Sequence, residues 1–326
     1  MMVNKALLVG NNYYDQFALK NCINDVKQMK RLLAENADGS KNFDVATLLG
    51  EHATRSNIRR GLRDLFKSNC DIALFYFSGH GIDDDNDGFI VSSDFAEDDY
   101  GISMPEIVKF VNRSKAKNKI VILDCCYSGF LGTSGIIGDE SILSPGTIIM
   151  SASRKDESAN DGPDGENGLF TGLFLEALDG AASDLFGNTP PSSIYSFIDK
   201  ALGPWEQRPI FKSNVDSFIS LRQNEPSIPL ATMKKITSFF QSRDSLLWLN
   251  PSFEPTNYPG SKDRHHEPYR TEENIKKFSI LQFYYRYGLI KPIEEKNMYE
   301  TAMNSKSCGL TKLGKYYFDL VKKNKI

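Results

Sequence analysis

The feature that most constrains the fold is a series of short apolar segments that alternate with segments of helical period. The apolar segments include 71–77 ("DIALFYF"), 119–123 ("KIVIL") and 146–151 ("GTIIMS"), and helical periods are found at 54–68 and 168–181. Continuous apolar strands separated by helices are typical of a mostly parallel sheet with helices on both faces. We therefore predict an α/β architecture with a sheet sandwiched by helices.

The charge balance changes near residue 225, which predicts a domain boundary there. Residues 226–326 contain 17 Lys and Arg against 10 Asp and Glu, whereas residues 1–225 contain 22 against 32. The Pro-containing stretch 224–229 ("NEPSIP") coincides with the change. We expect an α/β domain over 1–225 and a smaller, mainly helical domain over 226–326.

Composition and motifs exclude several classes of protein. Five cysteines are an odd number and form no CxxC pair, so neither a disulfide framework nor a zinc knuckle is indicated. No apolar run approaches the ~20 residues that span a bilayer, and the stretch 9–15 ("VGNNYYD") after the first predicted strand is not a Gly-rich phosphate loop. We expect a cytoplasmic protein that has no membrane segment and binds no metal or other cofactor.

Two predicted strands end in sequences that carry chemistry, "FYFSGHG" and "VILDCCYSG". Ligands of such sheets bind beyond the carboxyl ends of the strands. Because side chains alternate along a strand, Asp124 and Cys126 are expected on one side and Cys125 on the other. By the same parity, Ser78 and His80 share a side.

A thiol beside an imidazole can form a reactive thiolate, since the imidazole accepts the thiol proton. If the two strands are neighbours, His80 meets Cys126, and the backbone N–H groups of Gly81 and Cys126 can form an oxyanion hole. This constellation suits acyl transfer by a cysteine nucleophile. The alternatives are structural: a cysteine in an apolar strand is usually a core residue, as we expect for Cys125, and a histidine at a strand end can be structural too.

The sequence resembles the caspase/metacaspase clan of cysteine peptidases. "YFSGHG" is followed by "LDCCYSG", and the resemblance extends over roughly 4–222, through "ALLVGNNYY", "LKNCINDVKQM", "SASRKDESA" and "GLFTGLFLEAL". The pattern around the cysteine is that of metacaspases and bacterial caspase-like proteins rather than animal caspases. The resemblance implies a cysteine endopeptidase in which His80 is the general base and acid and Cys126 is the nucleophile. It also implies a role in regulated proteolysis, such as defence or programmed death.

The same resemblance suggests a pocket for a basic residue of the substrate. Asp124 stands where caspases specific for aspartate have a glutamine, and "NCIND" resembles the metacaspase segment that lines such a pocket. The implicated residues are Cys22, Asp25, Ser78, Asp124 and, at the rim, Asp156. Two carboxylates at the base of a cleft attract Arg or Lys, which predicts cleavage after these residues. Alternatively, Asp25 stabilises the N-terminus of a helix through the helix dipole.

Two departures from the family pattern shape further expectations. The acid-rich stretch 81–89 has no EF-hand spacing, so we expect it to be a solvated turn. The stretches 101–107 and 127–135 lack the acids through which many metacaspases bind calcium, so we expect activity that does not depend on calcium. No Lys or Arg lies between Lys119 and Arg154. An enzyme specific for Arg or Lys cannot cut itself there, so a single-chain enzyme is expected.

The C-terminal part contains two basic, amphipathic stretches, 271–293 and 310–323. They weakly resemble a winged-helix module. Three roles stay open: a solvated basic surface, nucleic-acid binding, and binding of a regulatory protein. The alternative for the whole chain is a catalytically silent caspase-like scaffold.

Overall fold

The computed structural model describes residues 4–14, 18–84, 87–96, 99–125, 143–152, 167–203, 209–215 and 217–326. The chain forms two compact units, Met1–Ser227 and Ile228–Ile326. The division lies two residues from the boundary predicted from charge.

The N-terminal unit is built on a six-stranded sheet. Its strands, in spatial order, are β2 (Phe43–Leu49), β1 (Asn4–Gly10), β3 (Ile72–Ser78), β7 (Asn118–Asp124), β8 (Thr147–Ser151) and β9 (Ile210–Asn214). All neighbouring pairs are parallel except β8 and β9, which are antiparallel. The predicted mostly parallel sheet is confirmed.

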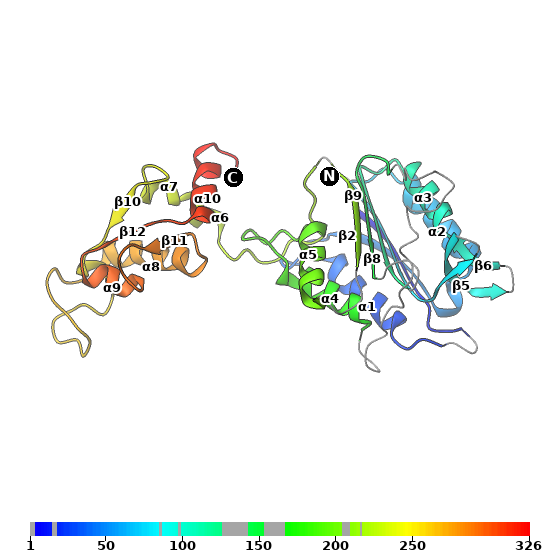
Figure 1. Cartoon of the computed structure of the whole chain (residues 1–326), viewed down its shortest axis with the longest axis horizontal. Helices are drawn as coiled ribbons and strands as arrows, with labels where there is room; N and C mark the ends of the chain where they lie inside the picture. The colour runs from blue at the N-terminus through cyan, green and yellow to red at the C-terminus, as the bar shows by residue number, and fades with distance from the viewer. Residues whose placement is uncertain are drawn as a thin grey trace. The chain divides into compact units, whose positions relative to one another are not determined.

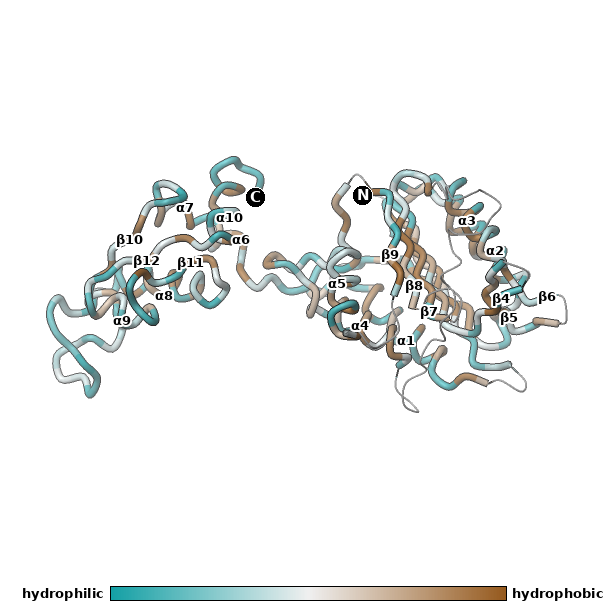
Figure 2. Tube along the Cα trace, in the orientation of Figure 1, coloured by the Kyte–Doolittle hydropathy of each residue, from teal (hydrophilic) through white to brown (hydrophobic). Residues whose placement is uncertain are grey.

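Helices cover both faces of this sheet. In chain order they are α1 (Cys22–Ala34), η1 (Gly50–His52), α2 (Arg55–Lys67), α3 (Met104–Asn112), α4 (Leu169–Glu176), the π-helical segment η4 (Ala177–Ala181) and α5 (Pro191–Leu202). α1, α4 and α5 lie on one face, and α2 and α3 lie on the other (Figure 1). The strands between the two layers are the most hydrophobic part of the unit (Figure 2).

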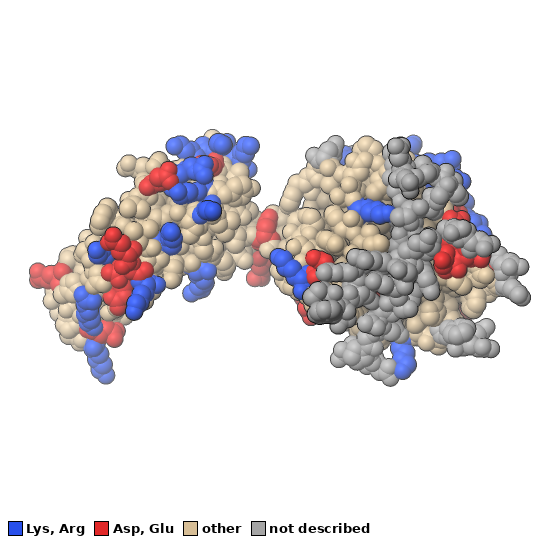
Figure 3. Space-filling model, viewed as in Figure 1, with Lys and Arg blue, Asp and Glu red and all other residues tan. Residues whose placement is uncertain are grey.

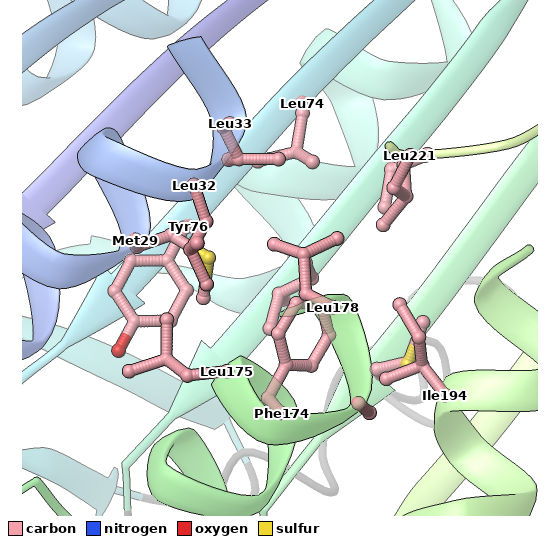
Figure 4. Packing of buried hydrophobic residues seen from close by; sticks show 14 of the residues in the cluster. Met29, Leu32, Leu33, Leu74, Tyr76, Phe174, Leu175, Leu178, Ile194 and Leu221 are labelled. Carbon is pink, nitrogen blue, oxygen red and sulfur yellow. The ribbon is translucent and has the colours of Figure 1, made fainter. Parts of the chain in front are cut away.

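The alternation of side chains divides the core into two clusters. Leu74 and Tyr76 of β3 pack with Met29 of α1 and Phe174 of α4 in one cluster (Figure 4). Phe75 belongs to the other cluster, against α2 and α3. Each strand therefore presents apolar side chains to both helical layers, which is why its sequence is continuously apolar.

A second, three-stranded antiparallel sheet follows β3. It consists of β4 (Gly81–Asp84), β5 (Asp87–Ala96) and β6 (Asp99–Ser103) in that order. Only a hairpin is indicated by the sequence around 88–93, and the structure adds β6. β4 begins directly after His80, so the backbone that follows this residue is held by the hydrogen bonds of the second sheet.

The start of α3 has part of a capping box, for which Ser103 and Glu106 have the required spacing in the sequence. The Ser103 hydroxyl accepts the Glu106 N–H at 3.3 Å. The Glu106 carboxylate instead accepts two hydrogen bonds from Arg59 of α2, at 2.6 and 2.8 Å. This ion pair raises the pKa of Arg59 and ties α2 to α3.

The C-terminal unit combines short helices with a small sheet. Its elements are α6 (Leu230–Lys234), α7 (Ile236–Phe239), β10 (Leu246–Trp248), η5 (Pro251–Phe253), α8 (Glu272–Arg286), β11 (Ile290–Pro292), α9 (Met298–Met303), β12 (Ser307–Leu310) and α10 (Lys312–Lys322). The sheet order is β10, β12, β11, with antiparallel pairs. The unit is therefore less purely helical than predicted, and its winged-helix character stays a prediction.

Basic side chains gather over the end of the C-terminal unit where α10 lies (Figure 3). Some are ion-paired: Lys315 with Asp244, and Arg243 with Asp319. Among the described residues of the whole chain, no helix is long and apolar enough to cross a membrane.

Candidate active site

The carboxyl ends of β3 and β7 lie side by side. Ser78 and Asp124 are paired across the two strands, and the Gly79 N–H continues the pairing by donating to the Asp124 carbonyl at 3.3 Å. Each lies two positions after a residue, Tyr76 or Ile122, whose side chain packs in the cluster with α1 and α4, so it shares that face. Cys125 is 1% exposed and packs in the opposite cluster, as strand parity predicts.

Asp25 of α1 reaches the end of β3. One carboxylate oxygen, Oδ2, accepts the Ser78 hydroxyl at 2.8 Å, and Oδ1 accepts the Gly168 N–H at 3.2 Å. Asp25 is in the first turn of α1, where the helix dipole favours an acid, and it is only 1% exposed. The helix-terminus role and the strand-end role are therefore compatible.

Asp124 has a separate set of partners. Its Oδ2 accepts the Thr171 hydroxyl of α4 at 2.6 Å, and the Tyr76 and Thr171 hydroxyls are 2.6 Å apart. Because Thr171 has a single proton, which it gives to Asp124, Tyr76 is the donor to Thr171. Burial, and then the charges of Asp25 and Asp124, raise the pKa of Tyr76 well above its ordinary value, so the phenol keeps that proton.

His80 is half-buried and is held by Tyr14. The two ring centroids are 4.5 Å apart in an edge-to-face arrangement, and the Tyr14 hydroxyl accepts the His80 N–H at 3.1 Å. The same hydroxyl donates to the Val91 carbonyl at 3.2 Å, and the Val91 N–H donates to the His80 carbonyl at 2.9 Å. Burial raises the pKa of Tyr14, so it remains a hydrogen-bond donor.

Gly79 is required by this arrangement. A Cβ at position 79 would lie 2.5 Å from the Tyr14 hydroxyl and 2.7 Å from the Phe77 ring. Any larger residue would displace Tyr14 or Phe77. The small residues of "SGHG" thus allow the phenol to approach the backbone beside the imidazole.

The remaining predicted residues have different outcomes. Cys22 is buried at the start of α1, and Gly81 is the first residue of β4. Cys126 and Asp156 lie outside the described residues, so their predicted roles stay predictions.

The acid-rich stretch 81–89 lies on the β4–β5 hairpin, where Asp84 is paired with Asp87 and residues 85–86 are not described. Within the described ranges, no group of three or more His, Cys, Asp or Glu side chains could hold a metal ion.

Two residues of this site were not found by sequence reasoning. Tyr14 and Thr171 make the contacts described above, yet each comes from a segment far along the chain from its partner. The available signals were weak: a tyrosine just after the first strand, and one hydroxyl within the apolar helix "GLFTGLFLE".

The fold and the paired strand ends define an α/β protein of caspase type, and comparison with known proteins agrees. The caspase domain family, peptidase family C14, matches residues 3–217. The chain belongs to this family.

Curated relatives are metacaspases of plants, fungi and other eukaryotes. Metacaspase-4 of Arabidopsis thaliana is 33% identical over 150 residues, covering 40% of this chain and 34% of the relative. Metacaspase-1 of Ajellomyces capsulatus is 28% identical over 211 residues, covering 55% of this chain and 57% of the relative. The chain thus spans about a third of the plant relative's length and just over half of the fungal one.

Solved structures show the same fold. Caspase-1 from Spodoptera frugiperda has a TM-score of 0.51 at 12% identity, covering 68% of this chain and 91% of that chain. A protein of Geobacter sulfurreducens also has a TM-score of 0.51, at 19% identity, covering 69% of this chain and 98% of that chain.

Proposed function

We propose that the chain is a cysteine endopeptidase that cleaves protein substrates after Arg or Lys. The observation that carries the specificity is the pair of buried carboxylates, Asp25 and Asp124, on either side of Ser78 at the carboxyl edge of the sheet. Hydroxyl and amide groups, described above, hold the oxygens of these carboxylates in place. A guanidinium or ammonium group supplies the opposite charge, and Arg can bond in a bidentate manner.

The proposed chemistry uses His80 and Cys126. Ser78 and Asp124 are paired across β3 and β7. His80 comes two positions after Ser78, and Cys126 comes two positions after Asp124. His80 accepts the thiol proton, and the thiolate attacks the carbonyl carbon of the Arg or Lys residue. The N–H groups of Gly81 and Cys126 stabilise the oxyanion, and His80 then protonates the leaving amine. Water, deprotonated by His80, hydrolyses the thioester and restores the thiol.

Substitution of the two adjacent cysteines tests this proposal against a catalytically silent scaffold. Cys126→Ala should abolish hydrolysis of an Arg-containing peptide. Cys125→Ala should retain most of it, since Cys125 lies in the core. A Cys126→Ala enzyme with full activity would exclude the dyad and favour another nucleophile. A folded wild-type chain that cleaves no Arg or Lys peptide would favour the scaffold.

The absence of Lys and Arg between Lys119 and Arg154 supports activity as a single chain. Active enzyme analysed by intact mass should show no cut between residues 130 and 150. Two fragments divided there in active material would contradict the proposal.

For the setting of this activity, we propose a reducing compartment such as the cytoplasm, and a role in regulated proteolysis. Among the described residues, no disulfide joins the four cysteines, Cys22, Cys70, Cys125 and Cys308, which suits such a compartment.

We further propose that the C-terminal unit binds a regulatory protein, or alternatively nucleic acid, through its basic surface. A gel shift with duplex DNA that weakens steeply with salt would favour nucleic acid. If no gel shift is seen even at low salt, the result would favour a regulatory protein as the partner.

A further inference from the structure

The C-terminal unit contains one long connection without helix or strand, residues 254–271 between η5 and α8. It is drawn as the yellow-to-orange loop that precedes α8 in Figure 1. Connections longer than ~12–15 residues without secondary structure are uncommon in compact domains and usually have a function.

The two ends of this loop are fastened together by Asn257, which is fully buried. Its amide group donates to the carbonyls of His266 and Pro268, each at 3.0 Å, and its Oδ1 accepts the His266 N–H at 2.9 Å. Its own carbonyl accepts the Arg270 N–H at 2.9 Å. Residues 258–265 therefore form a protruding tip on a closed neck, which is the form of an Ω-loop.

The tip itself is exposed, and the hydrogen bonds of its backbone are local. All of its residues are exposed except Ser261, which is half-buried. The Ser261 N–H donates to the Tyr258 carbonyl, and the Asp263 N–H donates to the Ser261 hydroxyl. Exposed loop tips of this kind are preferred sites of proteolytic cleavage, because their backbone can extend into a protease cleft without unfolding a core.

Two basic residues lie in this tip, Lys262 and Arg264. The Arg264 guanidinium is 3.7 Å from Glu300 and its side chain is 53% exposed, so the ion pair is loose and accessible. The tip thus presents the residue types that the proposed carboxylate pocket accepts.

Basic residues near the boundary between the two units are less suitable. Arg222 has a side chain that is only 11% exposed; it pairs with Asp179 and donates to the Glu35 carbonyl at 3.2 Å. Lys234 is the last residue of α6, and Lys235 follows it directly in helical conformation. A protease must first release these segments from their structure.

We propose that this chain is its own substrate at the loop tip: a second copy cleaves the Lys262–Asp263 or Arg264–His265 peptide bond. This inference rests on the proposed Arg/Lys specificity. The thiolate of one copy attacks the carbonyl carbon of Lys262 or Arg264 in the other, the Asp263 or His265 amine leaves with a proton, and water hydrolyses the thioester. Because the neck contacts of Asn257 lie outside the tip, the two products stay together in the folded protein and separate only on denaturation.

The test uses the full chain with the Cys126→Ala variant as substrate. A trace of wild-type enzyme is added, and the products are identified by intact mass and N-terminal sequencing. The expected result is a new N-terminus at Asp263 or His265, fragments that separate in denaturing electrophoresis, and a single unchanged peak in native size-exclusion chromatography.

Matched variants locate the cut. Lys262→Gln with Arg264→Gln, placed in the Cys126→Ala substrate, should abolish cleavage. Lys276→Gln with Lys277→Gln, which changes two exposed lysines of α8, should leave cleavage unchanged. In an active Cys126 background, the Lys262/Arg264 variant should hydrolyse an Arg-containing peptide at the wild-type rate.

Parallel assay of the Arg peptide separates the two proposals. If the peptide is hydrolysed and the loop stays intact, self-cleavage is wrong and the proposed function stands. If the Cys126→Ala chain is cut without wild-type enzyme, a contaminating protease is responsible and self-cleavage is overturned. If neither peptide nor loop is cut, both proposals fail.

Discussion

The Tyr14 ring lies edge-on against the His80 ring with centroids 4.5 Å apart, and the Tyr14 hydroxyl accepts the His80 backbone N–H at 3.1 Å. One buried phenol thus restrains both the backbone and the imidazole of the proposed general base. An imidazole positioned in this way approaches a thiol without first losing conformational freedom.

Tyr14→Phe should lower activity without removing the ring contact. It removes the hydroxyl that bridges His80 and Val91, which should cost about 1–3 kcal/mol in the free energy of unfolding. We also expect kcat/KM for an Arg peptide to fall roughly 10-fold, mainly through kcat, because His80 is less well placed. Urea unfolding and steady-state kinetics measure the two effects.

The neighbouring tyrosine is the control for this change. Tyr13 is 62% exposed, so Tyr13→Phe should leave stability and kinetics near wild type. The pH profile of the rate at which iodoacetamide alkylates Cys126 should change in Tyr14→Phe and stay unchanged in Tyr13→Phe. A Tyr14→Phe enzyme with unchanged kcat and alkylation profile would refute the positioning role.

Neutralising either pocket carboxylate should weaken selection of basic residues. Removing one partner of a buried charge pair costs about 2 kcal/mol or more, so Asp25→Asn or Asp124→Asn should lower kcat/KM for an Arg peptide on the order of 30-fold. Asp44→Asn changes an exposed acid of β2 that pairs with Lys41, and serves as the control. Equal kinetics in Asp25→Asn, Asp124→Asn and Asp44→Asn would argue against the pocket.

Thr171→Val should show how far Asp124 depends on its hydroxyl partner. The substitution keeps the shape but removes the donor to Asp124 and the acceptor for Tyr76, both buried. A loss of about 1–3 kcal/mol in the free energy of unfolding is expected, together with a raised KM for Arg peptides. Thr171→Ser retains the hydroxyl and should recover most of the KM. Thermal and urea unfolding at matched pH measure the stability of both variants. A Thr171→Val variant as stable as Thr171→Ser would contradict the prediction.

Lys119 gives a prediction for the dependence of stability on pH. It is 4% exposed at the amino end of β7, its ammonium donates to the Pro145 carbonyl, and burial lowers its pKa from 10.5. Between the folded and unfolded pKa values the unfolded chain binds more protons, so the contribution of Lys119 to the free energy of unfolding increases as pH rises toward 10.5.

The slope from this one group is at most about 1.4 kcal/mol per pH unit. Lys119→Met should remove it, so the wild type gains stability relative to this variant as pH rises through the alkaline range. Lys67→Met replaces an exposed lysine at the end of α2 and should follow the wild type. Parallel curves for the wild type and Lys119→Met would contradict the assignment.

The sequence predicts those features of the site that depend on backbone geometry. Strand alternation placed Ser78 and Asp124 on one face and Cys125 in the opposite core, and the structure agrees, because an extended chain has no other choice. The parallel sheet was predictable for a similar reason, since strands covered on both faces must be apolar throughout.

Contacts between distant segments could not be predicted from the sequence alone. Tyr14 contacts His80 across 66 positions, and Thr171 contacts Asp124 across 47. No local pattern specifies such pairs. Glu106 illustrates the same limit: its spacing from Ser103 suits a capping box, but the approach of α2 gives its carboxylate a stronger partner in Arg59.

The most direct test of the central claim is hydrolysis of peptides that differ only in the residue before the cleaved bond. In a panel with Arg, Lys, Gln and Asp at that position, the enzyme should cleave after Arg and Lys alone. Asp25→Asn should reduce the ratio of kcat/KM for the Arg peptide to that for the Gln peptide. Cleavage after Asp, with Arg and Lys peptides left intact, would contradict the account.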